Sequence, residues 1–233
     1  MIKFFRKIRY NLMETGKTSK YVKYAIGEII LVVIGILIAL TINNWNETRK
    51  ANNNEITLLQ KLQEENSINL ESLIYDVDYR KNMPKIIEDF TFFLEKENLE
   101  KENDSLPYFF EKILRSTSYT FTNSSLVNYV KLHNSSYSAF TKELTTLQAF
   151  QKDLELISEK AVDIKIKNLF ETLENDIDFY SLEIKSFNTL KSLRFKNRIF
   201  LISGIEQEIS YHFDKTLKQQ QKVDSLITSR LKY

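Results

Sequence analysis

The longest hydrophobic run in the chain lies near the N-terminus. It covers the 18 residues from Ala25 to Ile42, and Glu28 is its only charged residue. As an α-helix this run would extend about 27 Å, close to the thickness of the hydrocarbon core of a bilayer. The pattern therefore predicts a transmembrane helix over residues 24–45. Its flanks carry three aromatic residues of the kind that prefers the membrane interface, Tyr21, Tyr24 and Trp45.

The residues before the apolar run are strongly basic. Residues 1–23 contain one acid and seven cations, a local net charge of +6, whereas residues 43–233 carry 26 basic and 29 acidic side chains, net −3. By the positive-inside rule the N-terminus is cytoplasmic. We expect the cations to contact the inner leaflet, as a short amphipathic helix or as a disordered basic tail. These cations are Lys3, Arg6, Lys7, Arg9, Lys17, Lys20 and Lys23.

A cleaved signal peptide is the alternative interpretation of this segment, because a basic region followed by an apolar run is common to both. The basic region is long, and no A-x-A-like cleavage site follows the apolar run. Both observations favour a membrane anchor that is retained.

One side of the expected transmembrane helix differs from the rest. At 100° per residue, Glu28, Val32, Gly35 and Ala39 fall on one stripe. Small residues allow close helix packing, and a carboxylate facing lipid is costly, so this stripe is predicted to pack against another membrane protein or a second copy. Two alternatives for Glu28 stay open: it could extend to the cytoplasmic headgroups, or it could carry protons in a larger complex.

The remaining chain has the composition of a helical bundle. After residue 42 it contains one glycine, Gly204, and two prolines, Pro84 and Pro107, and such a shortage of breakers favours long helices. A heptad pattern over residues 56–77 is compatible with a coiled coil, or with one amphipathic helix of a bundle within the chain. Its positions are Ile56, Leu59, Gln63, Asn66, Leu70, Leu73 and Val77.

Further along the chain, the pattern predicts where helices end. Pro84 is expected to end the first long helix, and Pro107 to lie in the first turn of another. Residues 116–123 read as a loop, with a short strand as the alternative. A helical stripe from Tyr137 to Phe187 is too long for one globular helix, so a break is expected between residues 162 and 178. A last helix follows. The predicted fold is all-α: one transmembrane helix continuing into an antiparallel bundle of about five or six helices over residues 46–233.

Catalytic and metal-binding patterns are missing from the sequence. It has no cysteine and two histidines, His133 and His212, neither of which belongs to a metal-binding motif. We expect His133 to cap a helix end and His212 to be a satisfied buried or boundary residue. The basic and aromatic residues from Arg194 to Phe200 fit an ordinary bundle surface better than a nucleic-acid site. These patterns predict a non-enzymatic protein without cofactor, metal or nucleic-acid partner.

The N-terminal sequence also carries a resemblance. MIKFFRKIR followed by GKTSKYVKYAIGEIILVVIGILIALTINNWNETRK resembles the N-terminal signature of an uncharacterised family of Gram-negative bacterial single-pass membrane proteins, known as a domain of unknown function. The resemblance covers Met1 to Lys50. It implies an inner-membrane location with a periplasmic C-terminal domain, and it implies no activity.

Three hypotheses for the function follow. The first is a membrane-anchored periplasmic scaffold that accompanies a larger membrane complex. The second is a sensory input module, which would need a partner's cytoplasmic output domain because residues 1–23 are too few for a folded domain. The third and weakest is an envelope enzyme for which no residue set can be named.

Overall fold

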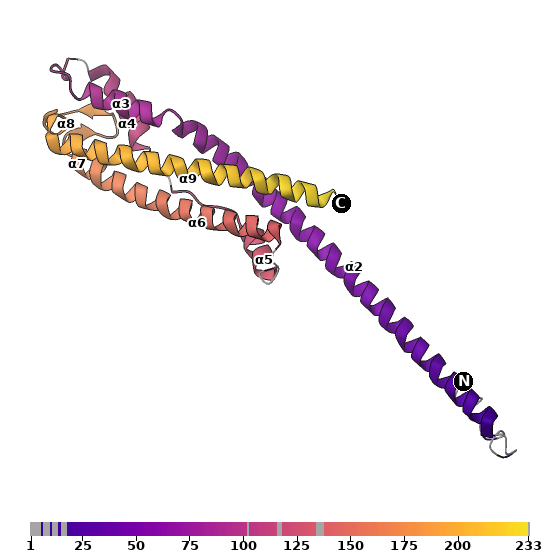
Figure 1. Ribbon diagram of the computed structural model, residues 1–233. Coiled ribbons are helices and arrows are strands. Elements are labelled where there is room, and N and C mark those ends of the chain that lie inside the picture. Colours follow the sequence, from indigo (N-terminus) through magenta and orange to yellow (C-terminus); the bar gives the residue numbers. More distant parts are fainter. Residues whose placement is uncertain are drawn as a thin grey trace. The chain divides into compact units, whose positions relative to one another are not determined.

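The computed structural model of this chain describes residues 6, 10, 14, 18–101, 103–115, 118–133 and 138–232, with only the backbone at 18, 20, 21 and 103. The described residues are predominantly helical, which confirms the predicted fold class, and they divide into two compact units, residues 1–57 and 58–233. The main helices are α2 (Thr18–Arg80), α3 (Met83–Phe93), α4 (Leu106–Leu114), α5 (Ser124–Leu132), α6 (Ala139–Lys165) and α9 (Leu193–Leu231) (Figure 1).

Shorter elements complete the second unit. A short 3-10 helix, η1 (Asn103–Ser105), precedes α4, and a short π-helix, η2 (Ile166–Phe170), follows α6. The chain then forms α7 (Glu171–Leu173), a two-stranded hairpin of β1 (Ile177–Asp178) and β2 (Glu183–Ile184), and α8 (Asn188–Lys191). Ile177 pairs with Ile184 in this antiparallel hairpin.

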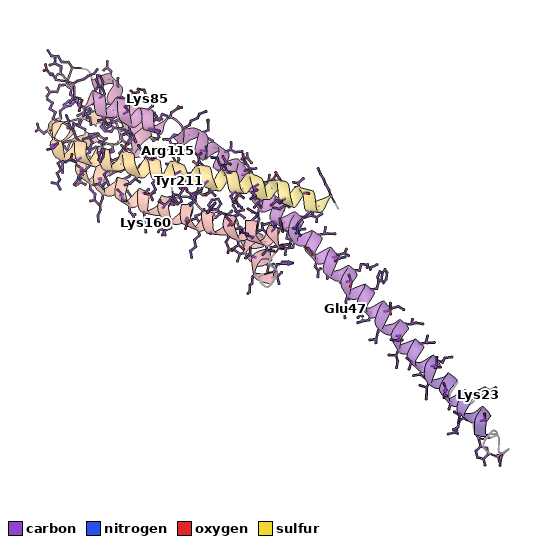
Figure 2. The ribbon with its side chains drawn as sticks, viewed as in Figure 1. Lys23, Glu47, Lys85, Arg115, Lys160 and Tyr211 are labelled. Atoms are coloured by element: carbon purple, nitrogen blue, oxygen red, sulfur yellow. The ribbon has the colours of Figure 1, made fainter. Side chains whose placement is uncertain are left out.

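The first unit consists of the N-terminal part of α2. Among the described residues, one helix is long and apolar enough to cross a membrane, and none of its apolar window is buried by other parts of the protein. Lys23 and Glu47 lie on α2 at either side of this apolar segment (Figure 2). The helix predicted over residues 24–45 is therefore present.

The second unit is built around three long helical segments. α9 runs antiparallel to α6, because Gln151 bonds Gln220 near one end of the pair while Lys165 meets Glu206 near the other (Figure 1). It also runs antiparallel to the last turns of α2, where Arg80 likewise meets Glu206. α2 and α6 are consequently parallel to each other, and the residues between them carry the chain back along the bundle.

The hydrophobic core is divided into three clusters. The largest packs α3, α4 and α7 to the start of α9, with Phe90 in edge-on or tilted contact with Phe109, Phe110 and Phe195. A second cluster gathers residues from α2, α5, α6 and the end of α9. The third, around Leu73 and Phe213, lies midway along the long helices and is the smallest. Polar side chains fill much of this middle region.

Several expected boundaries are confirmed. α2 ends at Arg80, and Pro84 stands in the first turn of α3, where a missing N–H costs little. Pro107 has the same position in α4. α6 ends at Lys165, inside the interval predicted for a break. Three heptad positions on α2, Leu59, Asn66 and Leu73, are buried within the chain, whereas Ile56 is exposed.

The prediction was wrong for the segment after this break. Ile177, Tyr180 and Ile184 were assigned to a helical stripe, whereas the structure places them in the β1–β2 hairpin. The turn is fixed by Asp178, whose carboxylate accepts N–H bonds from Tyr180 and Ser181. Tyr180 is fully exposed, so it was not a core residue at all. Apolar residues spaced three or four apart cannot distinguish a short hairpin from a helix.

Residues 118–123 form the predicted loop, and its backbone is hydrogen-bonded by side chains rather than by a sheet. Asn69 on α2 accepts the N–H of Thr122 at 3.1 Å and donates to its carbonyl at 2.7 Å. On α6, Glu155 accepts the N–H of Phe121 and Ser158 that of Tyr119, each at 2.9 Å. The loop is thus tied to two helices. Residues 116 and 117 lie outside the described part.

Candidate functional site

The predicted packing stripe lies on one continuous helix. Glu28, Val32, Gly35 and Ala39 all belong to α2, at spacings that align them along its length. Val32, Gly35 and Ala39 are exposed, and a Cβ added at Gly35 would meet no atom within 4 Å. The helical geometry of the stripe is therefore present, while its role in packing stays a prediction.

The interfacial and basic residues are described only in part. Tyr24 and Trp45 are exposed on α2, and the Arg49 guanidinium lies over the Trp45 ring at 5.6 Å. Arg6 and Lys23 are exposed. The remaining predicted contacts lie outside the described residues or have only their backbone described: Lys3, Lys7, Arg9, Lys17, Lys20 and Tyr21.

A cluster of buried charges occupies the middle of the bundle. The Glu206 carboxylate on α9 meets Arg80 Nη1 from α2 at 2.7 Å and Lys165 Nζ from α6 at 2.5 Å. Side-chain exposure is 2% for Glu206, 4% for Lys165 and 11% for Arg80. Lys165 Nζ also donates to the Arg115 carbonyl at 3.1 Å. One carboxylate therefore joins all three long helices.

Burial decides the electrostatics of this ion cluster. Removing an ion from water disfavours its charged form, so burial lowers the pKa of Lys165, and the attraction of Glu206 only partly opposes this. Burial likewise raises the pKa of Asp76, against the opposing effect of Arg80 and Arg115. The phenol of Tyr119 is also buried, which raises its pKa strongly.

Aromatic rings cover two of the cations. The Arg80 guanidinium lies over the Phe213 ring at 4.7 Å, and the Arg115 guanidinium over the Tyr79 ring at 3.9 Å. Such cation–π contacts favour a guanidinium in partly desolvated positions. Arg80 is largely buried beside Glu206, whereas the Arg115 side chain is exposed and only its carbonyl contacts the buried cluster.

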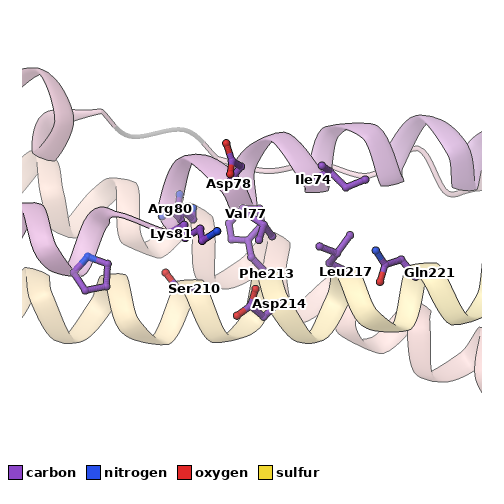
Figure 3. A pocket seen from close by; sticks show the side chains of 11 residues that line it. Ile74, Val77, Asp78, Arg80, Lys81, Ser210, Phe213, Asp214, Leu217 and Gln221 are labelled. Atoms are coloured by element: carbon purple, nitrogen blue, oxygen red, sulfur yellow. The ribbon is translucent and has the colours of Figure 1, made fainter.

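A groove opens beside this cluster between α2 and α9 (Figure 3). Its volume is about 690 Å³. Apolar side chains form most of its wall, among them Ile74, Val77, Phe213 and Leu217. Arg80 and Ser210 stand at one end, and both Arg80 Nε and Ser210 Oγ are buried without a hydrogen-bond partner in the described part of the chain.

A second polar layer lies nearer the C-terminal end of α9. Gln220 donates to Asn66 at 2.8 Å and accepts from Gln151 at 3.1 Å, which again joins α9, α2 and α6. Asn66 donates to Asp224 at 3.0 Å. Within the part of the chain that the structure describes, no buried side-chain N or O atom of this layer lacks a hydrogen-bond partner, so the layer gives no indication of a ligand.

The histidines do not form a site. His133 follows the end of α5, where its Nδ1 lies 3.0 Å from the Tyr129 carbonyl, as predicted. His212 has the boundary position that was predicted. Its hydrogen bonding differs from the prediction, because the buried Nδ1 has no hydrogen-bond partner within the described residues. Among these residues no group of three His, Cys, Asp or Glu side chains could hold a metal ion.

Arg80, Lys165 and Glu206 were not among the residues predicted to form a site. A signal for two of them existed, because each interrupts an apolar stripe at helical spacing. Lys165 follows Ala161 on the buried face of α6, and Glu206 stands between Ile202 and Ile209 on that of α9. A charge at a core position of an amphipathic helix indicates a buried ion pair, since such charges are almost never buried unless paired.

The fold and the buried cluster define a class: helical proteins with one N-terminal helix that can cross a membrane and a bundle with a charged centre. Residues 28–192 match the family model described as a family of unknown function, DUF6090, and the chain belongs to this family. No curated protein matches the chain, and no solved structure does.

Proposed function

We propose that this protein is a non-enzymatic interaction protein anchored in the bacterial inner membrane, an accessory subunit of a larger membrane complex. Its N-terminus would lie in the cytoplasm and its helical bundle in the periplasm. The observation that carries the proposal is the stripe on α2, where half-buried Glu28 lies on the same side of an apolar helix as the exposed residues Gly35 and Ala39. That side is suited to a second helix within the bilayer.

Photo-crosslinking in native membranes tests this proposal. A crosslinking residue at position 35 or 39 is expected to capture a defined membrane protein or a second copy. Leu37 is the matched control, because it lies half a helical turn away from Glu28 in projection. Capture of lipid alone from all three positions would refute the scaffold proposal.

Charge substitutions test the acid of the stripe. If Glu28 makes a polar contact with a partner helix, Glu28→Gln reduces co-purification of the crosslinked protein at least several-fold. Glu47→Gln, beyond the apolar segment on the same helix, is expected to leave it unchanged. Equal effects of the two substitutions would favour a headgroup contact of Glu28.

The proposed topology has a direct test, since the chain contains no cysteine. Single cysteines at Ser19 and Asn52 flank the apolar segment on α2. A membrane-impermeant maleimide added to spheroplasts is expected to label Asn52→Cys, and to label Ser19→Cys only after lysis. The reverse pattern would place the bundle in the cytoplasm.

A sensory input module is the second candidate, and the continuity of α2 supports it. One helix contains both the apolar segment and Arg80 of the buried cluster. A shift of this helix could carry a signal across the membrane to a partner's output domain. Crosslinking between copies at residues 43–50 would then change under osmotic or acid stress, and a constant pattern would argue against signalling.

A further inference from the structure

The groove between α2 and α9 has features of a ligand site that the scaffold proposal does not use. We propose that it binds a small amphipathic carboxylate, whose anionic group is held by Arg80 and Ser210 and whose apolar part lies over Phe213 and Leu217. This inference is independent of what the membrane helix contacts.

The shape of the groove suits such a ligand. Its volume of about 690 Å³ falls within the range of roughly 300–1,000 Å³ that is typical of small-molecule sites. Apolar walls with a few convergent polar groups at one end are also characteristic of these sites. Here the walls include Val77, Phe213 and Leu217, and the polar end contains Arg80 and Ser210.

The polar end has unused hydrogen-bond donors. Arg80 Nη1 donates a hydrogen bond to Glu206. Among the described residues, neither Arg80 Nε nor Ser210 Oγ has a hydrogen-bond partner. In Figure 3 the Ser210 hydroxyl points from α9 towards Arg80 and Lys81 of α2. A guanidinium edge and a hydroxyl can both donate to one carboxylate, and such charge-assisted bonds are strong where water is excluded.

The donors at the polar end favour an anion over a cation. Glu206 meets both Arg80 and Lys165, and half-buried Asp76 also attracts Arg80, so the buried charges nearly balance, while exposed Lys81 adds a cation to the lining of the groove. Asp78 and Asp214 also line the groove and oppose an anion, but both are exposed. Water and salt screen exposed charges far more than buried ones, so the largely buried Arg80 guanidinium, with its unpaired Nε–H, outweighs these two aspartates at the polar end.

The test uses the full chain in lipid nanodiscs and a trifluoromethyl-terminated octanoate followed by fluorine NMR. Saturable binding above that of empty nanodiscs is expected. Ser210→Met fills the polar end and is expected to abolish binding, and Ser210→Ala to weaken it about tenfold, since a hydrogen bond to a charged group is lost. Ser203→Ala, two turns earlier on α9 and outside the groove, should bind as the unaltered protein does.

Competing ligands with the same alkyl chain distinguish recognition of the carboxylate from binding of the chain alone. Octanoate should displace the probe, whereas octanamide and octylammonium, with the same chain and a neutral or positive head, should not. Unaltered binding by Ser210→Met, equal displacement by the three competitors, or no saturable binding would each overturn the proposal. Circular dichroism of each variant verifies that it is folded.

Discussion

At the scale of single residues, Glu206 is the side chain on which the centre of the bundle depends. Among the described residues, no other carboxylate meets both Arg80 and Lys165. Burying a charge is costly, and the cost is recovered only when a partner of opposite sign is in place. The two cations differ from Glu206 in this respect. If either Arg80 or Lys165 is removed, the other can still pair with Glu206.

Removing Glu206 is therefore expected to cost much more than removing Lys165. Glu206→Gln removes the carboxylate that both buried cations contact and should lower the free energy of unfolding by about 3–5 kcal/mol. Lys165→Met retains the pair of Arg80 and Glu206 and should cost less than about 2 kcal/mol. Urea unfolding of the full chain in detergent micelles, followed by circular dichroism, measures both. Equal losses would contradict this account.

The pH dependence of stability gives a second prediction for Lys165. An unfolded lysine keeps its proton up to its ordinary pKa of 10.5, whereas burial lowers the pKa of folded Lys165. Between these two values the unfolded state binds more protons, so the contribution of Lys165 to stability rises with pH. The stability of the unaltered protein relative to Lys165→Met should increase as the pH is raised towards 10.5.

This comparison removes the effect of the tyrosines. Burial raises the pKa of Tyr79 and Tyr119, so their contribution to stability falls in alkali, but it does so equally in both proteins. A difference in urea midpoint that stays constant across this pH range would show that Lys165 does not release its proton early in the folded state.

At the scale of elements, short α5 depends on a carboxylate from another helix. Glu65 on α2 accepts the N–H of Ser125 at 2.8 and 2.9 Å and the Ser124 hydroxyl at 2.6 Å. The Asn123 side chain, at the usual capping position, makes no such bond. A negative charge at a helix N-terminus satisfies free N–H groups and interacts favourably with the helix dipole.

Glu65→Gln is expected to loosen α5 selectively. The substitution retains one acceptor oxygen but removes the charge, which should destabilise the protein by about 1 kcal/mol. Hydrogen exchange should accelerate at the amides of residues 124–132 more than elsewhere. Glu64→Gln, an exposed neighbour on the same helix, is the control and should leave exchange unchanged. Uniform acceleration across the bundle would contradict a local capping role.

At the scale of the whole molecule, the second unit should fold without the apolar N-terminal part of α2. Its core contains residues only from Leu59 onwards. A fragment of residues 58–233 is expected to be soluble, helical and cooperative in thermal unfolding. A fragment of residues 81–233 lacks Leu59, Leu62 and Leu73 as well as Arg80, and it should aggregate or unfold without cooperativity. Equal behaviour of the two fragments would show that α2 is dispensable.

Sequence patterns revealed the elements of this molecule better than its interior. Three features follow from local chemistry and were predicted correctly: the helix formed by the apolar run, the helix boundaries near the two prolines, and the end of α6. The hairpin around Tyr180 was missed because its apolar spacing fits a helix, while its turn depends on Asp178 accepting local N–H groups. The ion cluster was missed because Arg80, Lys165 and Glu206 are far apart in the chain and meet only through the topology of the bundle.

The pairing of α2 with α9 also affects the time course of biosynthesis. Gln63 bonds Thr228 across 165 positions of the chain, and at about 5–20 residues per second the ribosome needs roughly 8–33 s to make that interval. During this delay Leu59 and Leu62 have no α9 to cover them. The bundle can close only after α9 has been synthesised, so the nascent chain is most exposed to proteases and to aggregation just before α9 emerges.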